Sequence, residues 1–85
     1  MTSEMIQARI RGFFARAFPG RSLRDGDDIF ALGFGNSLFA MQLVDFVEGE
    51  FGLTINNEDL DVANFSTIAS IRSLVERKVS AASAS

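Results

Sequence analysis

The chain has 85 residues, of which 47% are hydrophobic and 22% are charged, and this length supports one small core but not two. It contains no Cys and no His, which excludes disulfides, thiolate chemistry, Ser-His and Cys-His catalysis and most zinc sites. The net charge is −3, yet the stretch from Asp25 to Ile71 holds nine acids and no base, so nucleic acid is not an expected ligand. We therefore predict a protein that is not an enzyme, whose acidic stretch is either a solvated face or a docking surface for basic partners.

The first residues carry no signal-peptide pattern, and no apolar run reaches the roughly 20 residues of a membrane span, so we expect a soluble cytoplasmic protein. We also expect a monomer that does not bind membranes. The first helix is predicted from Ser3, as the N-cap, to Phe18, before the break at Pro19-Gly20. Its apolar positions recur at helical spacing: Ile6, Ile10, Phe13, Phe14 and Ala17. A long loop up to Asn36 follows, and three apolar side chains are expected to pin it to the core: Ile29, Phe30 and Leu32.

A second helix is predicted to begin at Asn36-Ser37, because both residues are good N-caps, and to end at Gly52, a suitable C-cap. On a helical wheel, one arc is expected to face the core: Ala40, Leu43, Val44, Val47 and Phe51. Phe39 and Phe46 lie at the other edge of that arc. A separate strip is predicted to be exposed beside Ser37: Leu38, Met41, Asp45 and Glu48.

A short third helix is predicted over residues 58–63, with acids in its first turn, and a fourth helix from a cap at Ser66 or Thr67 to Val79. Residues 80–85 are expected to form a flexible tail, so that residues 1–79 make a single domain. The predicted fold class is all-α, a small four-helix bundle with a long first loop and a short third helix.

Several chemical readings of the chain are weak. Gly33 and Gly35 precede a helix, but no strand comes before them and no P-loop Lys follows, which disfavours nucleotide binding. The spacing of Asp25, Asp27 and Asp28 does not match a calcium loop. Ser37 is either a simple N-cap or a residue that another enzyme modifies, because no nearby His or Lys could activate its hydroxyl.

The segment Leu32-Gly33-Phe34-Gly35-Asn36-Ser37-Leu38 resembles the segment around the attachment serine of acyl carrier proteins. The order of helices and the long first loop are similar to that family over nearly the whole chain. The resemblance implies that a phosphopantetheinyl transferase installs 4′-phosphopantetheine, taken from coenzyme A, on Ser37 through a phosphodiester bond. The terminal thiol of that group would then hold acyl groups as thioesters, and the carrier itself would need no catalytic residue or metal.

The resemblance also implies a partner-binding surface on the second helix and the acidic segment after it. Its expected members are Asn36, Leu38, Met41, Gln42, Asp45, Glu48, Glu58 and Asp59. Met41 would give an adaptable apolar contact, or would instead be a half-buried core residue, and the acids would meet basic patches on partner enzymes.

Two positions depart from the family pattern. Asn36 stands where the family usually has Asp, and the lost charge would weaken recognition by some transferases. Phe39 stands where many members have a polar residue, so it either enlarges the core or contacts partners.

The segments 36–44 and 57–61 are similar to discrete carriers that make alkoxymalonyl extender units from a glyceryl group for polyketide antibiotics. Partners would then include an acyl-loading enzyme, dehydrogenases and an acyltransferase or synthase. The alternatives are a fatty-acid carrier, a nonribosomal-peptide carrier, or a non-covalent helical adaptor with an acidic docking surface.

Overall fold

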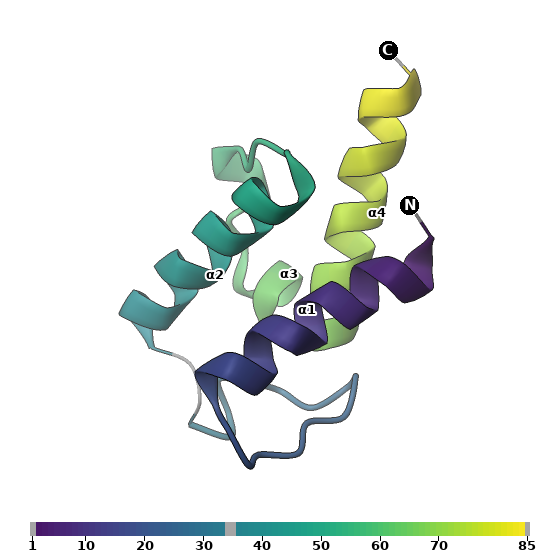
Figure 1. The fold of residues 1–85 in the computed structure, drawn as a ribbon. Helices are drawn as coiled ribbons and strands as arrows, with labels where there is room; N and C mark the ends of the chain where they lie inside the picture. The colour runs from purple at the N-terminus through teal and green to yellow at the C-terminus, as the bar shows by residue number, and fades with distance from the viewer. Residues whose placement is uncertain (1, 34–35, 85) are drawn as a thin grey trace.

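The computed structural model describes residues 2–33 and 36–84, and all regular structure in these ranges is helical (Figure 1). The elements, in chain order, are α1 (Ser3–Ala17), α2 (Ser37–Phe51), a 3₁₀ turn η1 (Asn57–Asp59), α3 (Val62–Phe65) and α4 (Ile68–Ala84). The predicted all-α bundle of four helices, with a long first loop and a short third helix, is confirmed.

The N-cap of α1 lies one residue earlier than predicted. The hydroxyl of Thr2, not of Ser3, accepts a hydrogen bond from the backbone N–H of Met5 at 3.2 Å. Ser3 is therefore the first helical residue, and the prediction that it caps the helix is wrong. Helix α2 begins and ends as predicted, with Asn36 as N-cap and Gly52 in the left-handed conformation that favours glycine.

The core is built from one apolar face of each helix. Its buried members are Ile6, Ile10, Phe14, Ile29, Phe39, Leu43, Val47, Phe65, Ile68, Ile71, Leu74 and Val75. No polar or charged side chain is buried among the described residues. The domain is therefore stabilised chiefly by apolar packing, as expected for a chain without disulfides.

The core face of α2 is rotated relative to the predicted arc. Phe39 is buried, whereas Ala40 and Val44 are only half-buried, because an aromatic cluster fills the space between α1 and α2. The ring of Phe13 stacks on Phe46 with centroids 4.5 Å apart, and Phe18 packs against Phe39 at 5.0 Å. The unusual Phe39 thus enlarges the core.

The first loop is fastened to the body of the protein. The backbone N–H of Ile29 donates to the carbonyl of Ser66 at 2.7 Å, and that of Ala69 donates to the carbonyl of Asp25 at 3.0 Å. Arg11 forms an ion pair and hydrogen bond with Asp25, which lowers the pKa of that carboxyl below its usual value. Ile29 anchors the loop as predicted, but Leu32 is 53% exposed, so its predicted anchoring role is wrong.

The predicted third helix is divided in two. η1 ends at Asp59 and α3 begins at Val62, with Asp61 as the N-cap of α3 through a 3.0 Å bond from the N–H of Ala63. Helix α4 continues to Ala84, five residues beyond its predicted end at Val79. A flexible tail over residues 80–85 stays a prediction about motion, and the last residue lies outside the described residues.

Candidate functional site at the start of helix α2

The site is built around the first turn of α2. The side-chain oxygen of Asn36 accepts a hydrogen bond from the backbone N–H of Phe39 at 2.8 Å, which satisfies one of the free donors of the helix start. Ser37 is the first residue of the helix, its side chain is exposed, and it does not act as the cap. Its hydroxyl is therefore free to be modified without loss of the cap.

The electrostatics of this helix end suit an anionic substituent. No acidic residue lies in the first turn of α2, and the backbone N–H groups there carry the positive end of the helix dipole. A phosphodiester on the Ser37 oxygen would place a negative charge beside that positive end. The residues present thus fit a phosphorylated prosthetic group at Ser37.

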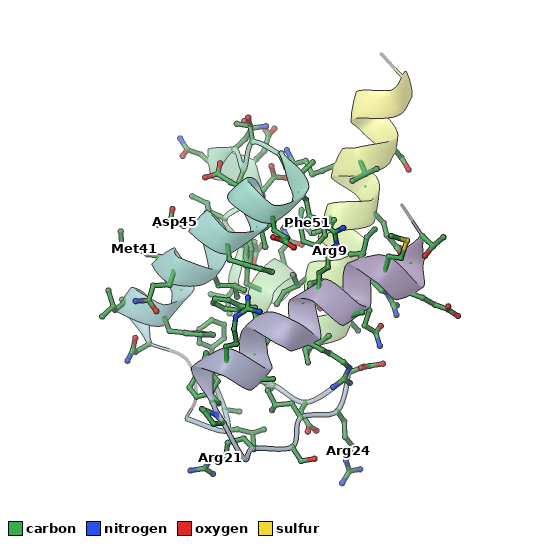
Figure 2. All side chains as sticks on the ribbon, in the orientation of Figure 1. Arg9, Arg21, Arg24, Met41, Asp45 and Phe51 are labelled. Carbon is green, nitrogen blue, oxygen red and sulfur yellow. The ribbon has the colours of Figure 1, made fainter. Side chains whose placement is uncertain are left out.

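The exposed face of α2 leads away from Ser37 and combines large apolar with polar side chains. Leu38 and Met41 are 66% and 67% exposed, so Met41 is a surface residue and not a core filler. Gln42 and Asp45 are also exposed. Figure 2 shows Met41 and Asp45 projecting from the outer side of α2. The structure therefore brings together most of the predicted partner-binding residues on one side of this helix.

The other three acids of the predicted partner-binding surface differ in their contacts: Glu48, Glu58 and Asp59. Glu48 is half-buried, and its carboxylate accepts a hydrogen bond from the backbone N–H of Ile55 at 2.9 Å. Asp59 pairs with Lys78, and that bond lowers the pKa of the Asp59 carboxyl. Glu58 is exposed and, within the described residues, has no hydrogen bond or ion pair. Two of these three acids therefore hold the connection after α2 in place.

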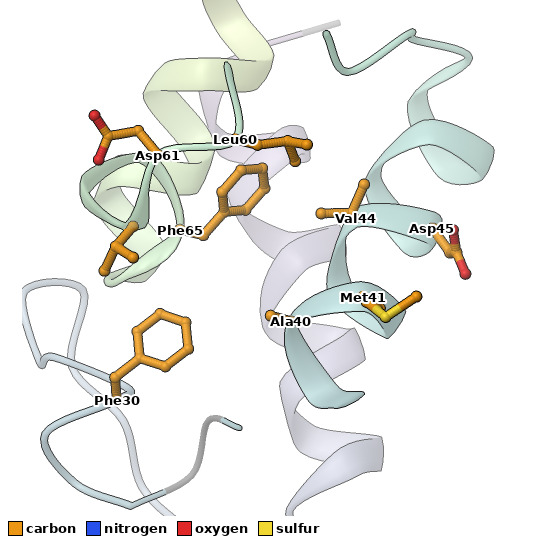
Figure 3. A pocket seen from close by; sticks show the side chains of 9 residues that line it. Phe30, Ala40, Met41, Val44, Asp45, Leu60, Asp61 and Phe65 are labelled. Atoms are coloured by element: carbon orange, nitrogen blue, oxygen red, sulfur yellow. The ribbon is translucent and has the colours of Figure 1, made fainter. Parts of the chain in front are cut away.

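A groove that the sequence did not predict lies between α2 and the η1–α3 segment, and we call it the α2–α3 groove (Figure 3). Its volume is about 340 Å³, and its lining residues are Phe30, Ala40, Met41, Val44, Asp45, Leu60, Asp61, Val62 and Phe65. Ala40 and Met41 follow Ser37 by about one helical turn, so the groove begins close to that serine. The sequence held one signal for this groove: the apolar residues Leu60 and Val62, which are flanked by acids.

Other sites are not found in the described ranges. No group of three or more metal-binding side chains occurs there, and none of the helices there has the length and apolarity needed to cross a bilayer. Within the described residues, the features that indicate a functional site are therefore found at the start of α2 and in the groove beside it.

Comparison with known proteins agrees with this geometry. The family model described as "Phosphopantetheine attachment site" matches residues 8–77, which is well over half of the chain. The protein therefore belongs to this family, whose domain is the attachment site of 4′-phosphopantetheine and whose members work as carriers. Carrier domains of this kind act with a phosphopantetheinyl transferase and with synthase enzymes. A search of curated proteins found no match.

Proposed function

We propose that Ser37 is the residue that carries 4′-phosphopantetheine, and that the protein is an acyl carrier without catalytic activity of its own. The observation that carries this proposal is the exposed Ser37 hydroxyl at the first residue of α2, with Asn36 supplying the cap. The serine lies inside the family match at residues 8–77. The other exposed serine of the match, Ser22, lies in the first loop and has no comparable helix start with a groove beside it, which favours Ser37.

The chemistry needs a partner enzyme. In the loading step the Ser37 oxygen bonds to the phosphorus that joins pantetheine to the nucleotide of coenzyme A, the nucleotide bisphosphate departs, and the hydroxyl proton leaves with a base. The chain has no His or Cys, so we assign the base to the transferase. The thiol of the attached arm supplies the thioester chemistry, and the carrier's own residues position the arm and present it.

The partner-binding surface follows from what surrounds Ser37. We propose that Asn36, Leu38, Met41, Gln42 and Asp45 contact partner enzymes directly, and that Glu58 adds charge at the edge. Leu38 and Met41 would fill shallow apolar pockets on the partner. Glu48 and Asp59 contribute to the same surface mainly by fixing the backbone after α2.

We further propose that the acyl group belongs to polyketide biosynthesis, with a glyceryl unit that is converted into an alkoxymalonyl extender unit. The support is the similarity of residues 36–44 and 57–61 to carriers of that kind. Loading, dehydrogenase and acyltransferase partners follow from that pathway, and a cytoplasmic location stays a prediction. Fatty-acid and nonribosomal-peptide carriers are the alternatives that a panel of acyl donors would reveal.

The decisive experiment is an intact-mass measurement after incubation with coenzyme A and a broad-specificity phosphopantetheinyl transferase. We expect the wild type to gain one phosphopantetheinyl group and Ser37→Ala to gain none. Ser22→Ala is the matched control, because Ser22 is also exposed but lies in the first loop, and it should be modified like the wild type. Modification of Ser37→Ala would overturn the site, and an unmodified wild type that still binds a basic partner would favour the non-covalent adaptor.

A further inference from the structure

We propose that a pocket beside the C-terminal half of α1 is a second docking site, which binds an acidic segment of a partner protein through one inserted apolar side chain. The pocket lies between α1 and the first loop, and we call it the α1–loop pocket. Among the described residues it shares no lining side chain with the α2–α3 groove. The inference goes beyond the proposed carrier function and does not depend on attachment at Ser37.

The floor of the α1–loop pocket is apolar. Phe14 and Ile68 are 4% and 1% exposed, and Phe18 and Leu23 are half-buried beside them. The volume of the pocket is about 180 Å³, whereas pockets for cofactors and other small molecules usually have about 300–1,000 Å³. This size favours a single inserted side chain over a whole ligand, and burial of an apolar side chain here would be favourable.

The walls of the pocket are held in place by hydrogen bonds within the protein. Nη1 of Arg11 donates to the carbonyl of Leu23 at 2.9 Å, and the same guanidinium pairs with Asp25. The backbone N–H of Arg21 donates to the carbonyl of Phe18 at 3.2 Å. A cavity that is already formed binds with a smaller loss of conformational freedom than a loop that must first become ordered.

The rim of the pocket is basic. Arg11 and Arg21 line it, and no acid does so among the described residues. From Met5 to Arg24 the chain holds five arginines and no acid. Arg21 and Arg24 are exposed, and Figure 2 shows both projecting outward from the first loop. The charge therefore complements an acidic segment and disfavours a basic one.

The acids that follow in the loop limit this charge without entering the pocket. Asp25 compensates the charge of Arg11, so attraction of an acidic segment would come chiefly from Arg21. Asp27 and Asp28 accept hydrogen bonds from backbone N–H groups of the loop at 2.9 Å and 3.0 Å, and neither lines the pocket. Because the net field is modest, much of the affinity must come from the apolar side chain that enters the pocket.

The two docking surfaces would then select partners of opposite charge. The α2 surface carries Asp45 and no base, which suits basic patches, whereas the α1–loop pocket suits acidic segments. A protein held at the α1–loop pocket would leave the start of α2 accessible. The carrier could thus stay on one partner while a second enzyme acts at Ser37.

The test uses three short peptides with blocked ends, titrated into the full chain and followed by amide chemical shifts. The first is Asp-Glu-Leu-Glu-Asp, the second has Ala in place of its Leu, and the third is the basic Lys-Arg-Leu-Arg-Lys. We expect the first to bind with a Kd of about 1 mM or tighter and to shift Ala15, Leu23 and Ile68. The Ala peptide should bind at least about fivefold more weakly, and the basic peptide should not shift these residues.

Two variants of the pocket have matched controls. Ala15→Leu should abolish binding, because Ala15 is an exposed lining residue and the larger side chain would fill the cavity. Ala8→Leu makes the same change at an exposed site of α1 outside this pocket and should bind like the wild type.

Arg21→Glu should weaken binding about tenfold at about 0.01 M salt and less at 0.15 M. Arg77→Glu, the same charge change on the exposed side of α4, is its control and should change affinity little.

The outcomes keep this proposal apart from the one about Ser37. Ser37→Ala should bind the acidic peptide like the wild type, whatever its modification shows. Unchanged binding in Ala15→Leu, shifts confined to α2, or equal affinity for the acidic and basic peptides would overturn the docking site. Saturable binding of free 4-methylpentanoate with the same shifts would assign the pocket to a small molecule and would also overturn it.

Discussion

Asp45 and Glu48 lie one helical turn apart on α2, and the structure predicts that substitutions at these two acids have different effects. Asp45 is exposed and, within the described residues, unpaired, whereas the Glu48 carboxylate holds the backbone N–H of Ile55 at 2.9 Å. Asp45→Lys should therefore change docking and leave stability nearly unchanged. Glu48→Ala should lower stability.

The magnitudes follow from simple electrostatics. A cation on a partner about 6 Å from Asp45 in a water-like dielectric is attracted by ~0.7 kcal/mol, so charge reversal changes the interaction by ~1.4 kcal/mol, or roughly tenfold in rate. Screening with a Debye length of about 8 Å at physiological salt reduces this to about threefold. Glu48→Ala removes a hydrogen bond to a charged group, and such a bond contributes about 1.5–3 kcal/mol. Two effects reduce the expected loss of stability to about 1 kcal/mol: Glu48 is partly exposed, and its negative charge is unfavourable beside the C-terminal end of the helix dipole.

The assay measures both effects on the same variants. Tm is expected to fall by about 4–8 °C in Glu48→Ala and by less than about 4 °C in Asp45→Lys. Initial rates of loading by the transferase, taken at about 0.01 M and 0.15 M salt, should show the defect of Asp45→Lys shrinking as salt rises. A wild-type loading rate for Asp45→Lys at low salt, or a Tm loss as large as that of Glu48→Ala, would refute this division of roles.

Four further outcomes are expected. Ser37→Ala should keep its Tm within about 4 °C, since Asn36 supplies the cap, and should lose all modification by intact mass. Asn36→Asp should fold normally, gain about 0.3–1 kcal/mol from the helix dipole, and be modified faster by a generic transferase; an unchanged or slower rate would show that charge there does not limit recognition. Met41→Ala should slow acyl transfer with little salt dependence, because its contact is apolar, and a strongly salt-dependent defect would contradict this. Phe39→Ala should cost about 3–5 kcal/mol in urea denaturation, and an unchanged midpoint would place its ring outside the core.

Features that depend on neighbours in the chain could be predicted from the sequence. Asn36 caps α2 because its side chain reaches a backbone N–H three residues later, and Gly52 ends the helix because the left-handed conformation suits glycine. Of the strip predicted to be exposed, Leu38, Met41 and Asp45 are exposed as helical spacing indicated, whereas Glu48 is half-buried. The start of α2 could therefore be predicted from the sequence alone.

Features that depend on distant partners could not be predicted in the same way. The wheel put Phe39 at the margin of the core, but rings from α1 surround it, and spacing along α2 carries no information about those rings. The predicted cap of α1 was also wrong by one residue, because Thr2 and Ser3 both carry a hydroxyl and the sequence pattern does not distinguish them. The α2–α3 groove could not be predicted because it depends on how two segments, separated by the loop after α2, are placed relative to each other.

The acidic stretch shows the same limit in its electrostatics. Nine acids from Asp25 to Ile71 suggested either a solvated face or a docking surface, but most of them are engaged within the protein. Those that hold a hydrogen bond or ion pair are Asp25, Asp27, Asp28, Glu48, Glu50, Asp59 and Asp61. Asp45 and Glu58 are the two without a partner among the described residues. Because short acidic side chains cap turns and helix starts so readily, charge counted along a chain overstates the charge left for a partner. Around Ser37 the exposed surface is therefore governed more by Leu38 and Met41 than by acids, and the salt dependence of loading should be that of one or two charges.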